Sequence, residues 1–296
     1  MKTISENRDQ ERITKIEESL KNLKHASELS SKVKEEIFNR TGEIEYPTGL
    51  TQLDNMLWGL HKKEVTVIGA RTSMGKTVMA IHLAKELADA NCTVLYLTLE
   101  MGAIQICERL VTNICEFNNI KLREGEDLYI LEERISLFEN WAKRVDLYID
   151  DQSGYHIDKL FEAVKRCQPD FVIIDYIQMI STLEFNNKLH AIEDFVKEIK
   201  KMGEARNFGT ILISQINREG VDRPYMHHLK HAGILEEHPD TVLLLHWDSF
   251  GGRYTIFVEK QRHGIVGKVE VKFEPQFNRF TDVEWRNFGK DKEIKG

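Results

Sequence analysis

The sequence has few of the features that mark secreted, membrane-spanning or disordered chains. It contains four cysteines and five prolines in 296 residues. No run of about 18 apolar residues occurs, so no membrane span is expected, and the polar start MKTISENRDQER is unlike a secretory signal. No CxxC pair is present, so we expect a cytoplasmic protein with reduced core cysteines rather than disulfides or a zinc site. The cysteines are Cys92, Cys107, Cys115 and Cys167.

The chain also has fewer basic than acidic residues. The chain has 41 Lys and Arg against 48 Asp and Glu, a net charge of −7. This excludes a chain coated with basic surface, but a ring can still confine its positive charge to loops that line a central channel. Hydrophobic residues make up 41% and charged residues 30% of the chain. These proportions are typical of a globular protein and allow a sizeable core.

Residues 1–45 differ from the rest of the chain, being rich in Glu and Lys. Their apolar residues follow helical spacing; these are Ile13, Ile16, Leu20 and Leu23, continued by Leu29, Val33 and Ile37. Such a helix either packs on its own domain or is an arm that docks on a neighbouring subunit, and the narrow stripe favours the arm. The breaker cluster Tyr46-Pro47-Thr48-Gly49 predicts a boundary, with one globular domain at 46–296.

Beyond this boundary, apolar strands alternate with helices. Strands are predicted at 65–68, 94–98, 147–149, 171–174 and 209–214, and helices at 77–90, 157–166 and 189–206. Three further strands, at 242–246, 254–259 and 266–273, have no long helices between them. The pattern predicts an α/β fold with a mainly parallel central sheet covered by helices on both faces and an antiparallel extension at one edge.

Residues 69–77 read GARTSMGKT and lie between a predicted strand and a predicted helix, the context that a phosphate-binding loop requires. Backbone N–H groups and the helix N-terminus would face the anion. Lys76 would reach the β- and γ-phosphates, and Thr77 would hold Mg²⁺. Ala70 replaces the usual Gly, which is tolerable if its dihedrals are ordinary. The cradle is Ala70, Arg71, Thr72, Ser73, Met74, Gly75, Lys76 and Thr77.

Three polar residues follow predicted strands and complete a phosphoryl-transfer site. Asp175 ends the run FVIID and would contact Mg²⁺, and Glu100 follows the strand 94–98 and would act as the general base for the attacking water. Gln215 follows the strand 209–214 and would sense the γ-phosphate. Carboxyl ends of parallel strands share one edge of a sheet, so these side chains should lie close together.

Five ordered segments together resemble the C-terminal motor domain of DnaB-type replicative DNA helicases of bacteria and their phages. These segments are ARTSMGKT at 70–77, Leu99-Glu100-Met101, Asp175-Tyr176-Ile177-Gln178, Ser214-Gln215-Ile216-Asn217-Arg218 and Lys260-Gln261-Arg262-His263-Gly264. The resemblance spans about residues 48–280. It implies a RecA-like P-loop NTPase preceded by a linker helix, assembled as a hexameric ring that uses ATP and Mg²⁺ to move on single-stranded DNA and unwind duplex.

The resemblance also implies roles for particular residues. Lys260 and Arg262 match basic residues that reach the γ-phosphate of a neighbouring subunit. Two loops, at about 181–188 and 217–232, would hold the DNA backbone without reading its sequence. The DNA-binding candidates are Arg218, Arg223, Lys230 and Gly233. A helicase loader or primase would be a further partner.

The chain departs from the family in two places. The resemblance begins at the linker, so we expect no counterpart of the N-terminal domain that precedes the linker in the family and helps to bind primase. The segment at 227–240 is also altered: Lys230 stands where Arg is usual and lacks its bidentate fork. Two alternatives therefore stay open, a DNA-stimulated ATPase that does not unwind and a regulator that co-assembles with a full-length helicase. His227, His228 and His231 leave a metal site as a lesser alternative.

Overall fold

The computed structural model describes residues 23–38, 44–152, 156–180, 188–217, 223–230, 232–248 and 253–283. The chain divides into two units, Met1–Glu43 and Ile44–Gly296. In the first unit, α2 (Ala26–Phe38) carries Leu29, Val33 and Ile37, all of them exposed. The predicted stripe positions Ile13, Ile16 and Leu20 lie outside the described residues. Docking of this arm on a neighbouring subunit therefore stays a prediction.

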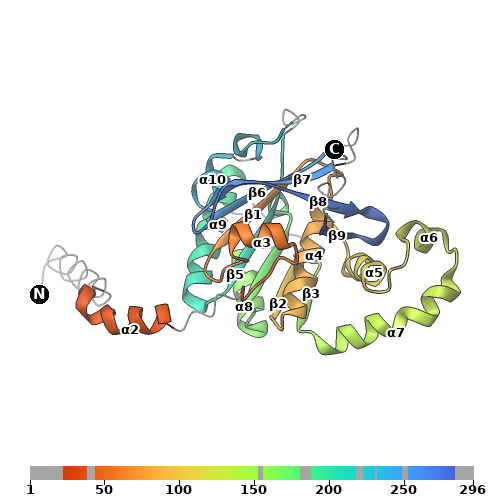
Figure 1. The fold of residues 1–296 in the computed structure, drawn as a ribbon, viewed down its shortest axis with the longest axis horizontal. Coiled ribbons are helices and arrows are strands. Elements are labelled where there is room, and N and C mark those ends of the chain that lie inside the picture. The colour runs from red at the N-terminus through yellow and green to blue at the C-terminus, as the bar shows by residue number, and fades with distance from the viewer. Residues whose placement is uncertain are drawn as a thin grey trace, which may run out of the picture. The chain divides into compact units, whose positions relative to one another are not determined.

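The second unit is built on one nine-stranded sheet in the order β3-β2-β4-β5-β1-β6-β7-β8-β9 (Figure 1). Strands β1 to β6 pair in parallel, and β6 to β9 pair antiparallel. The predicted fold class is thus confirmed, including the antiparallel extension at one edge. The strands are β1 Val65–Ala70, β2 Val94–Thr98, β3 Leu147–Asp150, β4 Phe171–Asp175, β5 Gly209–Gln215, β6 Thr241–Asp248, β7 Arg253–Gln261, β8 Gly267–Glu274 and β9 Arg279–Asp282.

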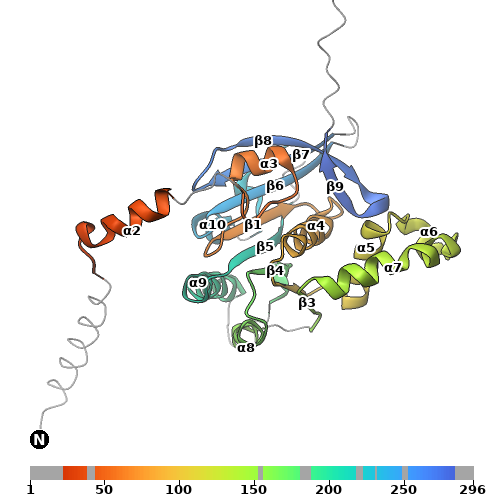
Figure 2. The ribbon, with the colours of Figure 1, turned by 60° about the horizontal axis from the view of Figure 1, so that its bottom comes forward.

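Helices cover both faces of the sheet, as Figure 2 shows for α3 and α4 on one side and α8 and α9 on the other. The helices are α3 Thr51–Leu57, α4 Lys76–Asp89, α5 Ala103–Ile114, α6 Asn119–Glu124, α7 Leu128–Arg144, α8 Ile157–Cys167, α9 Lys188–Arg206 and α10 Ala232–Glu237. Alternate strand residues point to opposite faces: Ile173 packs in the cluster with α4, and Val172 packs in the cluster with α9. Burial of all six β1 residues follows from its place in mid-sheet.

Several elements of the second unit were not predicted from the sequence. Besides the short helices α3 and α10, residues 103–144 form α5, α6 and α7, and the edge strand β9 closes the antiparallel extension. The longest of these helices, α7, buries only Trp141. Leu131, Ile135, Phe138 and Trp141 do follow helical spacing, so the sequence carries a signal for α7, although the first three are only partly buried.

The parallel register defines two opposite edges of the sheet. At the carboxyl-terminal edge Ala70 lies beside Gln215, and Thr98 lies beside Asp175. At the opposite edge Thr66 lies beside Thr241, which pairs with Gln261 at the end of β7. The two edges are one strand length apart, and β1 has six residues at a rise of about 3.3 Å each.

The cysteines are all free thiols. Burial raises the pKa of each thiol, that of Cys92 to about 11, so they are poor nucleophiles and poor metal ligands near neutral pH. Among the described residues, no helix is long and apolar enough to cross a membrane.

Candidate nucleotide site at the carboxyl-terminal edge of the sheet

The phosphate loop joins β1 to α4. Gly75 is the N-cap of α4, with a φ of 80°, a left-handed conformation that glycine adopts without strain. A Cβ at this position would lie 3.3 Å from Phe273 and 3.4 Å from both Phe280 and Tyr254. Ala70 is the buried last residue of β1 and does not have a positive φ, so the alanine in the motif carries no backbone strain.

An aromatic cluster from the antiparallel extension packs against this loop. The hydroxyl of Tyr254 donates to the backbone oxygen of Met74 at 2.5 Å. Its ring lies 4.7 Å from that of Phe280, which stacks on Phe273 at 4.7 Å. Burial raises the pKa of Tyr254, so its hydroxyl remains a donor. Strands β7, β8 and β9 therefore fix the loop, a role that no local pattern in the sequence assigns to them.

Lys76 begins α4 and lies inside the site. Its amine donates to the backbone oxygen of Arg71 at 3.1 Å. Burial lowers the pKa of Lys76; the charges of Asp175 and Glu100 oppose this, and that of Lys230 adds to it. Lys76 thus lies close enough to Asp175 and Glu100 for their charges to affect its pKa, and the roles of the three residues stay predictions.

Asp175 is the buried end of β4, only 3% exposed. It accepts hydrogen bonds from the hydroxyls of Thr77 and Tyr96, the latter at 2.9 Å. Burial raises the pKa of Asp175, while these two donors and Lys76 lower it and Glu100 raises it further. A buried carboxylate beside a threonine hydroxyl, with a second carboxylate near, is a hard-oxygen donor set that fits Mg²⁺.

Tyr96 was not predicted as a site residue. It lies in the middle of β2, fully buried, and its hydroxyl reaches the Asp175 carboxylate at the end of β4. Burial raises the pKa of Tyr96 well above its usual value, and the neighbouring Asp175 charge raises it further. The one sign in the sequence is a phenol within an otherwise apolar run, since a buried hydroxyl needs a partner.

Gln215 ends β5 and bridges two elements. Its Nε2 donates to Oγ1 of Thr72 in the phosphate loop at 2.6 Å, and its Oε1 accepts from the amine of Lys230 at 2.6 Å. The backbone joins the same two segments, because the Lys230 N–H donates to the Gln215 oxygen at 2.9 Å. The structure thus places the Lys230 side chain at the nucleotide site, whereas the sequence pointed to a contact with DNA.

The other predicted DNA contacts are distributed differently. Arg218 and residues 181–187 lie outside the described residues. The Arg223 guanidinium pairs with Glu259 at 3.2 Å and lies over the rings of Tyr225 and Phe257. Gly233 lies near the start of α10, where a Cβ would meet no atom within 4 Å. Arg223 is therefore engaged within the chain, and the DNA roles of all these residues stay predictions.

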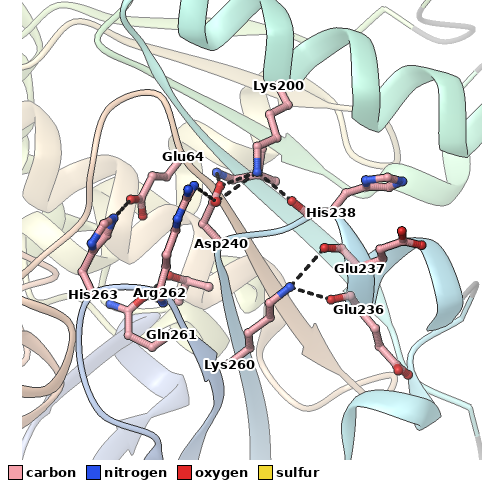
Figure 3. Close-up of polar contacts among 12 residues, drawn as sticks. Glu64, Lys200, Glu236, Glu237, His238, Asp240, Lys260, Gln261, Arg262 and His263 are labelled. Carbon is pink, nitrogen blue, oxygen red and sulfur yellow. Dashed lines mark hydrogen bonds and ion pairs between the residues drawn. The ribbon is translucent and has the colours of Figure 1, made fainter. Parts of the chain in front are cut away.

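The predicted finger residues lie at the opposite edge of the sheet (Figure 3). Lys260 donates to the backbone oxygens of Glu236 and Glu237 at 2.8 and 3.1 Å. Arg262 pairs with Asp240 at 3.0 Å, and its side chain is 64% exposed. Because they follow the end of β7, these cations are separated from the phosphate loop of their own chain by the length of β1.

The three-histidine alternative has no support from the described residues. His227 stacks on Tyr225 and lies edge-on to His228, and His231 falls outside the described residues. Across the ranges that the structure describes, no group of three or more His, Cys, Asp or Glu side chains is arranged to hold a metal ion.

The sheet order, the phosphate loop and its acidic partners define a nucleotide-binding protein of the P-loop class with a RecA-like sheet. Residues 46–282 match the DnaB-like helicase C terminal domain, and the chain belongs to that family. The predicted family resemblance is thereby confirmed over most of the chain.

Named relatives and solved structures agree with this family. The chain is similar to the replicative DNA helicase DnaC of Bacillus subtilis (strain 168), with 29% identity over 275 residues, covering 85% of this chain and 60% of that protein. It is also similar to the replicative DNA helicase DnaB of Haemophilus influenzae, with 28% identity over 274 residues, covering 86% and 58%. The chain therefore spans less than two thirds of the length of these relatives.

Two solved structures share the fold. One is an ATPase domain, with a TM-score of 0.83, 25% identity, and coverage of 89% of this chain and 100% of that one. The other, a DnaB-like replicative helicase described with its interactions with primase, has a TM-score of 0.79 and 25% identity, covering 93% and 72%.

Proposed function

We propose that this chain is the ATP-hydrolysing motor of a replicative DNA helicase, which works in the cytoplasm as a hexameric ring on single-stranded DNA. The observation that carries the proposal is the division of the catalytic groups between two edges of one sheet. Lys76, Thr77, Asp175 and Glu100 converge at the carboxyl-terminal edge, and Arg262 lies exposed at the other. Neither edge alone supplies the full set of groups that phosphoryl transfer uses.

The nucleotide would bind with its phosphates on the loop at 70–75 and the N-terminus of α4. Lys76 would exchange the Arg71 carbonyl for the β- and γ-phosphates. Thr77 and Asp175 would hold Mg²⁺, which when bound supplies positive charge against the phosphate oxygens. Glu100 would orient the attacking water and accept its proton, and Gln215 would report the γ-phosphate to the segment that carries Lys230.

The finger residues would act on a neighbouring copy. They lie one strand length from their own phosphate loop, roughly 20 Å for six residues at ~3.3 Å each, so a second chain must bring its nucleotide to them. A head-to-tail contact of this kind closes into a ring when its rotation permits. The exposed stripe of α2, Leu29, Val33 and Ile37, would dock residues 1–45 on the neighbour and stabilise the same assembly.

DNA would enter a central channel lined by the segments at 181–188 and 217–232. The contacts expected of Arg218, Arg223, Lys230 and Gly233 are to backbone phosphates, which carry no sequence information and suit a translocase. A relative whose structure is described with primase makes primase or a loader a reasonable partner to test.

One observation favours a second function. Arg223 and Lys230, two of the expected DNA cations, are engaged by Glu259 and Gln215. A chain that grips DNA weakly would be a DNA-stimulated ATPase that does not unwind. A forked-duplex assay separates the two, because this alternative predicts stimulation by single strands without strand separation.

The test measures ATP turnover against protein concentration, with and without single-stranded DNA. Lys76→Ala should lose turnover and keep its fold. Arg262→Ala should keep nucleotide binding and lose hydrolysis by about 10³–10⁵-fold. Arg166→Ala, an exposed arginine in the last turn of α8, is the matched control. Normal hydrolysis by Arg262→Ala, or a full specific rate at concentrations where the chain is monomeric, would reject the shared site.

A further inference from the structure

The exposed side chain of Arg262 is attached to a buried carboxylate. Its Nη1 donates to Oδ1 of Asp240 at 3.0 Å, and the Asp240 side chain is only 4% exposed where that of Arg262 is 64%. Asp240 thus engages one edge of the guanidinium while the group remains open to solvent. Figure 3 shows Arg262 extending from the end of β7 toward Asp240.

Asp240 itself is fixed to the central strand. Its Oδ2 accepts the backbone N–H of Val65 at 3.0 Å, and its own N–H donates to the Val65 oxygen at 2.9 Å. Val65 is the first residue of β1, the strand that leads to the phosphate loop. The carboxylate therefore has little freedom to move relative to the sheet.

A second cation completes the cluster. The amine of Lys200, from α9, donates to both Asp240 oxygens at 2.9 and 3.0 Å and to the backbone oxygen of His238 at 2.9 Å. Burial alone would raise the pKa of Asp240, but the Val65 amide, Lys200 and Arg262 outweigh it and hold that pKa below its usual value. The group formed by Asp240, Lys200 and Arg262 has one carboxylate and two cations. Its net charge is therefore positive, which favours a phosphate beside Arg262.

The backbone at Arg262 is fixed as well. Its N–H donates to Oε1 of Gln261 at 2.8 Å, and the same oxygen accepts the hydroxyl of Thr241 at 2.6 Å. The Gln261 amide donates in turn to the Leu57 oxygen at 3.1 Å. The backbone N–H and the guanidinium of Arg262 are thus both hydrogen-bonded to side chains that are themselves held by other parts of the fold.

We propose that Asp240 is the positioning residue of the arginine finger, holding one edge of the Arg262 guanidinium so that its remaining N–H donors face the triphosphate of the adjoining copy. This inference rests on the proposed function, since it needs a nucleotide shared between chains. Lys200 offsets the charge of Asp240, so that Asp240 does not neutralise the positive charge that the finger presents. Pre-ordering of this kind removes side-chain entropy that the arginine would otherwise lose at the transition state.

A merely structural role for Asp240 makes a different prediction. Asp240 would then act through Val65 on the β1 strand and phosphate loop of its own chain. The two roles separate in mixed rings, because the finger serves the neighbour's nucleotide and the phosphate loop serves its own. A chain with a damaged finger can be rescued by a neighbour with an intact one, whereas a chain with a damaged loop cannot.

The experiment mixes Asp240→Asn chains with Lys76→Ala chains and measures ATP turnover. Asp240→Asn keeps the size and shape of the side chain; alone it should lower kcat at least tenfold without changing nucleotide affinity. In the mixture, Lys76→Ala chains supply intact fingers to intact Asp240→Asn phosphate loops. With the two chains in equal amounts, turnover should then rise to about a quarter of the wild-type rate per chain, as random neighbours in a head-to-tail ring allow.

A mixture of Arg262→Ala with Lys76→Ala chains is the control and should be rescued in the same way. If that control is rescued and the Asp240→Asn mixture is not, Asp240 acts on its own chain and the positioning role is wrong, while the shared site stands. Wild-type turnover by Asp240→Asn alone also overturns the role. If the control mixture stays inactive, the shared site fails and the positioning role fails with it.

A second variant covers the case in which Asp240→Asn folds poorly. Arg262→Lys keeps the charge but lacks the planar fork that can hold a carboxylate on one edge and a phosphate on another. It should lose hydrolysis to within about tenfold of Arg262→Ala, a difference of ~1.4 kcal/mol, with an unchanged melting temperature. Turnover near the wild-type rate would show that no oriented guanidinium is needed.

Discussion

The side-chain amine of Lys230 donates a hydrogen bond to Oε1 of Gln215 at 2.6 Å. An ammonium can only donate, so the amide oxygen must face Lys230 and the amide nitrogen must face Thr72. The nitrogen does so, at 2.6 Å. Lys230 therefore sets which end of Gln215 faces the phosphate loop, and a DNA phosphate that drew Lys230 away would release that amide.

Lys230→Met is expected to weaken the coupling between DNA and ATP turnover. Without the ammonium, the Gln215 amide loses its fixed orientation, and a hydrogen bond to a charged group is worth about 1.5–3 kcal/mol. Stimulation of the ATPase by single-stranded DNA should fall about tenfold or more on that scale. Nucleotide affinity should change little, because Lys76 and the loop remain. The measurement is ATP turnover against DNA concentration at fixed salt.

Lys201→Met is the matched control for this variant. Lys201 is an exposed α9 residue that pairs with Glu198, so its loss removes a charge without touching the site. Full stimulation in Lys230→Met, or equal loss in both variants, would contradict the link through Gln215.

Tyr96→Phe is expected to raise the Mg²⁺ concentration needed for half-maximal turnover. The change removes the 2.9 Å donor to Asp175, which helps to keep that buried carboxylate ionised. A hydrogen bond to a charged group is worth about 1.5–3 kcal/mol, which corresponds to roughly ten- to hundredfold in concentration. Tyr148→Phe, an exposed tyrosine on β3, should leave the Mg²⁺ curve unchanged. An unchanged curve in Tyr96→Phe would remove Tyr96 from the site.

The carboxyl-terminal edge could be predicted from the sequence because its signals are local. Asp175 follows four apolar residues, and Gln215 ends a second apolar run. In a parallel sheet every such residue reaches the same edge, whatever the strand order. The position of each polar residue at the end of its strand was therefore enough to predict that it lies near the phosphate loop.

Other parts of the site depend on neighbours that the sequence does not reveal. Tyr96 lies 79 residues from Asp175, and Tyr254 lies 180 residues from Met74. Only the order of the strands in the sheet brings these groups together. It places β2 next to β4, and it places the antiparallel extension against the phosphate loop. The same holds for Asp240, whose partners Val65 and Lys200 come from β1 and α9. The contact between Lys230 and Gln215 is likewise set by the fold, and the DNA role of Lys230 stays a prediction.

Asp175→Asn is expected to change how stability depends on pH in the absence of Mg²⁺. Burial raises the pKa of Asp175 above its ordinary value of 3.8, so the folded chain holds this proton more tightly than the unfolded chain does. The resulting stability is fully present below the ordinary pKa and is lost as pH rises through the raised one. Asparagine has no proton to lose, so the melting temperature of the variant relative to wild type should increase over that range.

Melting curves from about pH 3 upward, recorded with a chelator, test this linkage. The variant should also lose ATP turnover, since it cannot offer a carboxylate to Mg²⁺. A difference in melting temperature that stays constant or falls with rising pH would show that the pKa of Asp175 is not raised.

Gly75→Ala is expected to abolish tight nucleotide binding. At a φ of 80° an alanine is strained by about 1–2 kcal/mol. In addition, its Cβ would lie 3.3 to 3.4 Å from Phe273, Phe280 and Tyr254, and Tyr254 holds the Met74 oxygen. Relief of that crowding would shift the phosphate loop, so affinity for ATP should fall more than tenfold, beyond what backbone strain explains.

Gly125→Ala separates the two effects. Gly125 caps α6 with a φ of 72°, and a Cβ there would meet nothing within 4 Å. It should therefore show a similar loss of stability from backbone strain, about 1–2 kcal/mol, with normal nucleotide binding. Binding measured by titration with a fluorescent ATP analogue, beside melting temperatures for both variants, provides the comparison. If Gly75→Ala binds as well as Gly125→Ala, the aromatic cluster does not position the loop, and the antiparallel extension has no part in the nucleotide site.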